Sequence, residues 1–226
     1  ENTNGGEDYW VIKIDVSGNI EWQNTIGGSA NDQLRSIRQT SDGGYILGGD
    51  SNSGISGDKT EATIGQTDYW VIKLDPDGEI EWQNTIGGNN YEYLYSIQQT
   101  PDGGYITGGQ SKSDISGDKT ENTISLFAAS PTYDFWIVKL TPAGDIEWQN
   151  TIGSALNEQL WDLKITQDGG YICVGNGADY LSDDVTVITY CPAGGSWVVK
   201  LNSLGNIEWQ NSLSGYNASQ FHSVNV

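Results

Sequence analysis

The chain of 226 residues is long enough for one or two domains and is rich in glycine and aromatic residues, with 30 Gly, 9 Trp, 12 Tyr and 3 Phe. Ten basic against 30 acidic residues give a formal net charge of -20, which opposes binding to nucleic acid and to anionic lipid. No apolar run approaches the roughly 20 residues of a membrane-spanning helix. The composition therefore argues against nucleic-acid partners and membrane insertion, and favours short strands joined by tight turns.

One unit of about 60 residues recurs along the whole chain. In its clearest form it begins with Asp-Tyr-Trp-Val-Ile-Lys and ends with Ile-Glu-Trp-Gln-Asn-Thr-Ile-Gly. Its copies span Asp8–Gly27, Asp68–Gly87, Asp134–Gly153 and, in a more divergent form, Gly195–Ser214. Such a repeat indicates one supersecondary module per copy, each burying its apolar faces against its neighbours. We predict a single domain over 1–226, with repeats at 8–67, 68–133, 134–194 and 195–226.

Each repeat predicts four strands, here called A, B, C and D. The clearest examples are Leu94–Thr100 for A, Gly104–Gly109 for B, Asp68–Leu74 for C and Ile80–Gly87 for D. Thr-Pro-Asp-Gly-Gly between A and B, and Asp-Pro-Asp-Gly-Glu between C and D, are hairpin turn signals. Strand C is apolar at nearly every position, so both of its faces must be covered. The pattern predicts an all-β fold, a β-propeller of four-stranded antiparallel blades. A parallel β-helix is the alternative, but its coils are usually shorter and lack paired hairpin turns.

The strand count gives C and D at the start, three complete A–B–C–D units and a last A strand at Phe221–Val226. This corresponds to about four blades, the last of them incomplete. In one arrangement the chain forms a four-bladed ring, and the last blade contains the N-terminal C and D strands and the C-terminal A strand but no strand B. In the other arrangement the chain is a segment of a larger ring. An unpaired blade edge can accept a strand, so we expect self-association through that edge.

Long connections follow strand B, at Asp50–Thr67, Gln110–Tyr133 and Asn176–Gly194. The B–C and D–A connections share one side of the predicted sheets, and binding in repeat scaffolds uses the side where insertions collect. A glycan would stack there on exposed aromatic rings. The candidate ligand residues are Tyr91, Tyr93, Phe127, Tyr133, Trp161, Tyr180 and Tyr216.

Two cysteines, Cys173 and Cys191, have no counterparts in the other repeats. They predict a local disulfide and an oxidising, extracellular setting, with a pair of buried thiols as the alternative. Asn217-Ala218-Ser219 is a glycosylation sequon, with Asn217 as the acceptor.

Calcium is the metal that this composition favours, because carboxylate and carbonyl oxygens on glycine-rich loops suit a hard cation. A repeated Ile-Ser-Gly-Asp-Lys-Thr-Glu supplies one set of candidate ligands: Asp58 and Glu61, then Asp118 and Glu121. The alternative is an ordinary loop in which Asp caps a turn. Equivalent positions of the D–A loops supply a second set: Asp32, Glu92 and Glu158. Ring symmetry would bring these three toward one end of a central channel, where they either share a cation or accept backbone hydrogen bonds.

The unit Asp-Tyr-Trp-Val-Ile-Lys-Leu-Asp-Pro-Asp-Gly, followed by Ile-Gly-Gly, an acidic D–A loop and Asp-Gly-Gly-Tyr-Ile-Thr-Gly-Gly, resembles the SBBP-type β-propeller repeats. Similar units occur in large secreted and surface proteins of bacteria and archaea. The resemblance covers essentially the whole chain and implies a surface, secreted or matrix role such as adhesion. It brings no family-wide catalytic residues, and the long B–C loops depart from the shorter form.

Catalysis has little support in the sequence. His222 is the only histidine, and no acid pair stands apart from the repeats. We expect a non-enzymatic extracellular β-propeller, a structural or adhesive building block of a surface, matrix or filament, with no catalytic residues and no cofactor other than possible Ca²⁺. A carbohydrate-binding module using the long B–C and D–A loop face is the alternative, and a polysaccharide-degrading enzyme is third.

Overall fold

The computed structural model describes residues 3–125, 131–177, 182, 184–186, 195–213 and 221–226. Within these residues the secondary structure is all β, with 14 antiparallel strands in four sheets. The same residues contain no helix long and apolar enough to span a bilayer. The predicted all-β chain of four-stranded antiparallel sheets is thus confirmed.

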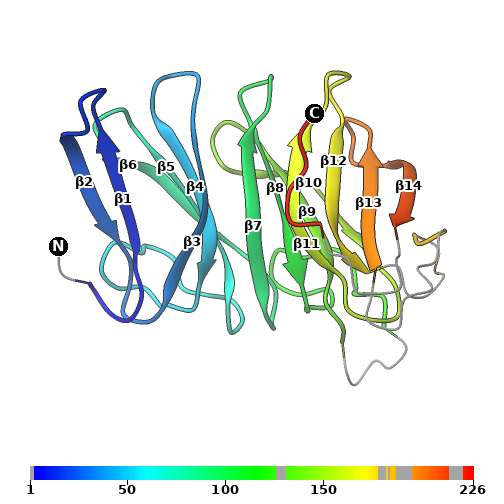
Figure 1. Cartoon of the computed structure of the whole chain (residues 1–226). Coiled ribbons are helices and arrows are strands. Elements are labelled where there is room, and N and C mark those ends of the chain that lie inside the picture. Colours follow the sequence, from blue (N-terminus) through cyan, green and yellow to red (C-terminus); the bar gives the residue numbers. More distant parts are fainter. Residues whose placement is uncertain (1–2, 126–130, 178–181, 183, 187–194, 214–220) are drawn as a thin grey trace.

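The sheets follow one another in chain order (Figure 1). Sheet I contains β1 (Tyr9–Ile14) and β2 (Ile20–Ile26). Sheet II contains β3 (Asp32–Gln39), β4 (Tyr45–Ser51), β5 (Asp68–Leu74) and β6 (Ile80–Ile86). Sheet III contains β7 (Glu92–Gln99), β8 (Tyr105–Ser111), β9 (Asp134–Leu140) and β10 (Ile146–Ile152). Sheet IV contains β11 (Gln159–Ile165), β12 (Tyr171–Gly177), β13 (Gly195–Leu201) and β14 (Ile207–Leu213).

Each four-stranded sheet is a meander whose strands are the predicted A, B, C and D in order. The hairpin turns close on glycine with positive φ, as at Gly78 with φ 87° and Gly103 with φ 86°. In the β5–β6 turn the Asp75 carboxylate accepts hydrogen bonds from two backbone N–H groups, those of Asp77 and Glu79, both at 2.9 Å. The turn residues therefore act as the sequence predicted.

The two kinds of connection lie on opposite sides of the molecule. A–B and C–D turns are at the top of Figure 1, and the D–A and B–C connections are at the bottom. This follows from the meander, because successive strands alternate in direction. The predicted long-loop side is confirmed.

Strand C forms the buried centre of each four-stranded sheet. Every residue of β5 and of β9 is buried. The first tryptophan of the strand is 0% exposed in each of sheets II, III and IV, at Trp70, Trp136 and Trp197. Each packs on the ring one repeat earlier: Tyr9 with Trp70 at 5.0 Å between centroids, and Tyr69 with Trp136 and Phe135 with Trp197 at 4.9 Å. These contacts join each sheet to the next.

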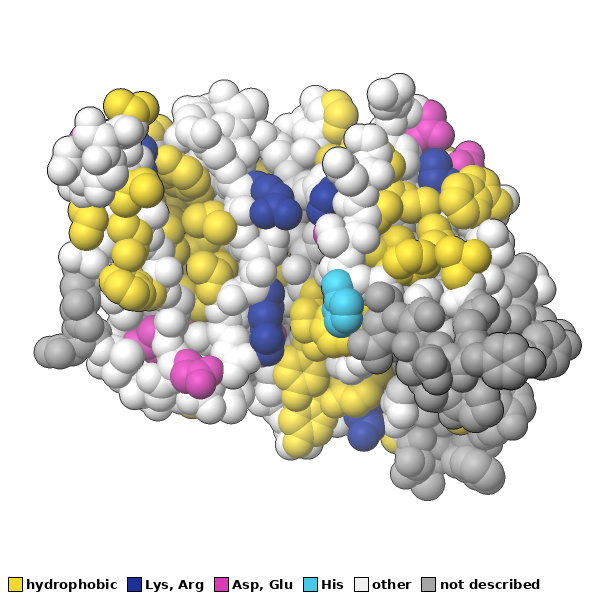
Figure 2. Space-filling model, in the orientation of Figure 1, with side chains coloured by type: hydrophobic (Ala, Val, Ile, Leu, Met, Phe, Trp, Pro, Cys, Tyr) yellow, Lys and Arg dark blue, Asp and Glu magenta, His cyan; other side chains and the backbone are white. Residues whose placement is uncertain are grey.

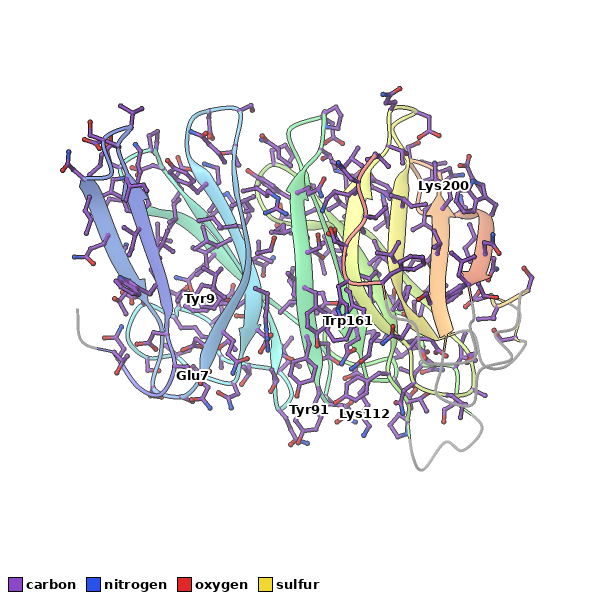
Figure 3. All side chains as sticks on the ribbon, viewed as in Figure 1. Glu7, Tyr9, Tyr91, Lys112, Trp161 and Lys200 are labelled. Atoms are coloured by element: carbon purple, nitrogen blue, oxygen red, sulfur yellow. The ribbon has the colours of Figure 1, made fainter. Side chains whose placement is uncertain are left out.

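A buried lysine on strand C ties the hairpin turn to strand D. Lys73 Nζ lies 2.9 Å from Asp42 in the A–B turn and 2.7 Å from Glu81 on β6. Lys139 and Lys200 repeat this arrangement, and Lys200 is labelled in Figure 3. In sheet I, which has no A or B strand among the described residues, Lys13 pairs with Glu21 at 3.0 Å and donates to the Pro76 carbonyl at 3.4 Å.

The predicted last A strand at Phe221–Val226 is wrong, because no strand forms over residues 221–226. A strand needs a hydrogen-bonded neighbour, and this segment has no strand B to pair with. Instead Ser223 Oγ and the Val224 N–H donate to Asp162 Oδ2 on β11, both at 3.2 Å. No described strand of sheet IV pairs with sheet I.

Trp70 and Trp10 occupy the same repeat position and provide a matched pair of variants. Trp70 is 0% exposed, whereas Trp10 is 60% exposed. Trp70→Ala should lower the free energy of unfolding by about 3–5 kcal/mol, the usual cost of removing a buried aromatic side chain. Trp10→Ala should cost less than about 1 kcal/mol. Urea denaturation followed by circular dichroism measures both, and equal costs would contradict the packing described here.

Candidate functional site

Three of the predicted ligand tyrosines meet on the long-loop face. Tyr91 precedes β7, Tyr93 lies on β7, and Tyr133 precedes β9. The rings of Tyr91 and Tyr93 stack with centroids 6.3 Å apart and an interplanar angle of 11°, and Tyr133 is 6.1 Å from Tyr93. Lys112 Nζ lies 5.4 Å from the centroid of the Tyr133 ring. Figure 3 shows Tyr91 and Lys112 at this end of the molecule. We call Tyr91, Tyr93, Tyr133 and Lys112 the tyrosine cluster.

Backbone hydrogen bonds hold the tyrosine cluster in place. The Lys112 N–H donates to the Tyr91 carbonyl at 2.9 Å. The Tyr133 N–H donates to Asn157 Oδ1 at 3.0 Å, and the Tyr133 carbonyl accepts from the Glu158 N–H at 2.6 Å. The Tyr91 hydroxyl also bonds to Gln66 Oε1. The rings are therefore presented by anchored backbone, and each is only partly buried.

A small polar hollow of about 170 Å³ adjoins the tyrosine cluster. Its lining residues are Asn31, Gln33, Asp50, Asn52, Thr67 and Tyr93. Asp50 is 5% exposed and pairs with Arg35, whose Nε lies 3.0 Å from Asp50 Oδ1. Burial nevertheless raises the pKa of Asp50, and it also raises the pKa of Tyr93. Amide, hydroxyl and carboxylate groups beside exposed rings can hydrogen-bond and stack on a polyhydroxylated ligand.

Trp161 does not join the tyrosine cluster. It lies on β11 between Tyr95, at 5.1 Å, and His222, at 5.3 Å between ring centroids. Its indole N–H is buried and has no hydrogen-bond acceptor. Phe127, Tyr180 and Tyr216 lie outside the described residues, as do the predicted glycosylation site Asn217 and the second cysteine, Cys191.

Cys173 is buried in the core of sheet IV, on β12. Burial raises the pKa of its thiol well above the usual range, so the thiol is protonated at neutral pH. Because Cys191 is outside the described residues, the disulfide stays a prediction.

The repeated Ile-Ser-Gly-Asp-Lys-Thr-Glu loop fastens onto neighbouring D strands. Asp58 Oδ2 accepts from the Gly27 N–H at 3.1 Å, and Glu61 Oε2 accepts from the Thr85 N–H at 2.7 Å. Lys59 between them is 1% exposed, with Nζ 4.7 Å from the centroid of the Trp70 ring, and burial lowers its pKa to about 8. The second copy repeats these contacts with Asp118, Lys119 and Glu121. The backbone contacts match the loop role that was the alternative to calcium binding.

The second set of candidate metal ligands is fully buried at the starts of the A strands. Asp32 Oδ2 accepts from the Gly28 N–H at 2.7 Å, Glu92 Oε2 from the Gly88 N–H at 2.9 Å, and Glu158 Oε2 from the Ser154 N–H at 2.8 Å. Within the described part of the chain, no three His, Cys, Asp or Glu side chains are grouped so as to hold a metal ion. Calcium binding stays a prediction.

These buried acids face a second acid on the preceding sheet. Asp68 interacts with Glu92, and Asp134 with Glu158. Burial, with the neighbouring carboxylate, raises the pKa of Asp68 to about 7 and that of Asp134 to about 9. Below these pKa values Asp68 and Asp134 hold a proton, which removes the repulsion between the two carboxyl groups of each pair.

Sequence patterns missed several residues of this face. Gln66, Lys112 and the Arg35–Asp50 pair carry no repeat signature. Gln66 reaches Tyr91 from the connection between β4 and β5, Lys112 and Tyr133 lie at the two ends of the β8–β9 connection, and Arg35 on β3 faces Asp50 on β4. Only the excess of tyrosine near the start of β7 marked the area.

No protein-family model and no curated protein matches the chain. A solved protein of unknown function from Bacteroides caccae is similar in structure, with 11% sequence identity, 92% of this chain and 77% of that chain covered, and a TM-score of 0.33. A similarity at this level assigns neither fold nor function.

Because of the raised pKa of Asp68 in its pair with Glu92, we expect the free energy of unfolding to fall as pH rises. Between pH 4 and pH 7 folded Asp68 keeps a proton that the unfolded chain, with a pKa of 3.8, has released. The free energy of unfolding should therefore decrease over that window. Asp68→Asn imitates the protonated acid and should flatten the slope in urea denaturation at several pH values. The exposed-site control Asp145→Asn should keep the wild-type slope, and an unchanged slope in Asp68→Asn would contradict the pairing.

Proposed function

We propose that the chain is a non-enzymatic β-propeller module of SBBP-repeat type that serves as an extracellular structural or adhesive building block. Support comes first from the sheets: each complete one is an A–B–C–D meander, and the A strands of sheets II, III and IV are neighbours. In a β-propeller such four-stranded sheets are arranged radially around a central channel. The -20 charge suits a soluble surface module that repels nucleic acid and anionic lipid.

One observation carries this proposal: the conspicuous repeated side chains are used to join sheets. The first-tryptophan ring contacts recur at all three junctions. The repeated acids accept backbone hydrogen bonds, as Asp32, Glu61 and Glu92 do. His222 packs against Trp161. A sequence that repeats its framework and varies only its loops fits a scaffold better than a single reaction centre.

Location and assembly test this proposal. Immunogold electron microscopy of the source cells, with antibodies against the chain, should show labelling at the cell surface or in extracellular assemblies. Dispersed label in the cell interior would contradict the building-block role.

Glycan binding is the second candidate, favoured by the tyrosine cluster beside the polar hollow. The partly exposed Tyr91 and Tyr93 rings offer a stacking surface, and Asn31, Gln33 and Asn52 offer amide groups next to it. A hydrophobic surface with a few polar groups is typical of sites for small ligands.

A glycan array tests this second candidate. Tyr91→Ala and Tyr93→Ala should each weaken binding of any retained glycan by about fivefold, since one aromatic contact contributes on the order of 1 kcal/mol. The control Leu204→Ala changes a residue that is 71% exposed, in the β13–β14 turn on the opposite side, and should bind as wild type does. Absence of binding by the wild-type chain, with and without Ca²⁺, would eliminate this candidate.

A further inference from the structure

A contact between Trp, Asn and Gly recurs at every junction between sheets. At the junction of sheets I and II the Trp22 ring covers Gly78 in the β5–β6 turn, where an added Cβ would lie 2.9 Å from the ring. Trp22 Nε1 donates to the Pro76 carbonyl at 3.1 Å, and Asn24 Nδ2 donates to the Gly78 carbonyl at 3.0 Å. The next junctions repeat this contact with Trp82, Asn84 and Gly144, and with Trp148, Asn150 and Gly205.

Each junction therefore has two different halves. The donor half is the Trp and Asn of strand D, which face the following sheet. The acceptor half is the turn glycine and the outer face of strand C on that following sheet, which includes its first tryptophan. Both halves come from strands C and D, so a junction of this kind does not require strand B.

The two ends of the molecule carry one uncovered half each. On sheet IV, Trp209 is 50% exposed and Asn211 is exposed, although they occupy the positions of Trp22 and Asn24. On sheet I, a Cβ added at Gly18 would have no atom beyond its chain neighbours within 4 Å, whereas the three equivalent glycines lie against tryptophan rings.

The outer face of β1 is uncovered as well. Trp10, Ile12 and Ile14 are 60%, 40% and 61% exposed. Their counterparts on β5, Trp70, Ile72 and Leu74, are all 0% exposed because sheet I covers them. Figure 2 shows hydrophobic side chains gathered at both ends of the visible face, over β1–β2 and over β13–β14. Exposed apolar surface on this scale marks an interaction site.

We propose that sheet IV of one molecule docks on sheet I of a second copy, so that the copies associate head to tail. This proposal rests on the building-block function above and specifies its partner and its surface. Trp209 of one copy covers Gly18 of the next, Asn211 donates to the Gly18 carbonyl, and Trp10 is buried. A second copy is the matching occupant because the chain's own junctions show both halves already fitted together three times.

The contact between copies differs from the internal junctions in one respect. Ser196 stands where Tyr9, Tyr69 and Phe135 provide the ring that packs on the next tryptophan. The docked interface thus lacks one aromatic pair and should be weaker than an internal junction. Residues 221–226 contact sheet IV at Asp162 on β11, whereas the docking contact uses β13 and β14.

Because the two halves differ, the association is heterologous and extends into a chain or closes into a ring of copies. Each copy carries a net charge of -20, so salt should promote association by screening the repulsion between copies. An isologous dimer would instead place the same surface on both sides of the contact.

Sedimentation velocity over a range of protein concentrations, at low and high salt, tests the proposal. The wild-type chain should form larger species as concentration and salt rise. Trp209→Ala removes the donor half, and Gly18→Asn blocks the acceptor half with a residue that tolerates positive φ. Each variant alone should sediment as a monomer. Ile115→Ala alters a residue that is 60% exposed on the loop after β8, and this control should associate as wild type does.

Mixing the two variants gives the decisive result. Trp209→Ala still has an intact acceptor half and Gly18→Asn an intact donor half, so the mixture should form a one-to-one dimer and nothing larger. Circular dichroism checks that both variants are folded. A monomeric wild type at every concentration and salt, or variants that associate as wild type does, would overturn head-to-tail docking. Label at the cell surface without association in solution would contradict head-to-tail docking but support the building-block role. Association in solution with label confined to the cell interior would support the docking but contradict the building-block role.

Discussion

Packing of one strand C against the next holds this molecule together. An aromatic ring in one repeat lies against the tryptophan one repeat later, at 4.9 to 5.0 Å between centroids, and in two junctions a tyrosine hydroxyl also donates to that tryptophan's carbonyl. Such ring pairs contribute about 0.5–1.5 kcal/mol beyond the area that they bury. Both faces of strand C must then be apolar, and the turns beside it must be glycine so that the strand D tryptophan can approach. The Tyr-Trp-Val-Ile-Lys-Leu and Asp-Gly signatures follow from this one contact.

Buried charge is the second constraint on this molecule. Lys59 and Lys119 are 1% exposed, and Asp32 and Glu92 are 0% exposed. Buried polar groups are tolerated only when they are hydrogen-bonded or neutralised. Glu92 and Asp32 Oδ2 accept from backbone N–H groups and hydroxyls, whereas Asp32 Oδ1 has no partner among the described residues. Each lysine donates to a threonine hydroxyl and lies over a tryptophan face. Loops that resemble cation sites in the sequence therefore fasten one sheet to the next.

Repetition also makes the two ends of the molecule informative. Sheets II and III are covered on both sides, so the residue types that face a neighbouring sheet are buried there. At the ends these residues are exposed for lack of a neighbour, as Trp10 and Trp209 are. The exposed end surfaces are thus framework surfaces without a partner, whereas the tyrosine cluster lies on loops that the repeats do not share.

The sequence by itself determined the repeat, the A–B–C–D order of the strands in the complete sheets, the turn glycines and the side on which the long loops lie. These features depend on local chemistry: continuous apolar runs, glycine at positive φ and Asp-Gly turns. It also marked Tyr91, Tyr93 and Tyr133 as candidates, because they stand outside the repeat pattern.

Only the tertiary structure decided which residues meet. It brought Lys112 to Tyr133 and Arg35 to Asp50, paired Asp68 with Glu92 across two sheets, and separated Trp161 from the tyrosines. It also showed that residues 221–226 form no strand, although their sequence follows the strand A pattern. A strand depends on a hydrogen-bonded neighbour, and a binding face depends on residues far apart in the chain, so neither is fixed by local sequence.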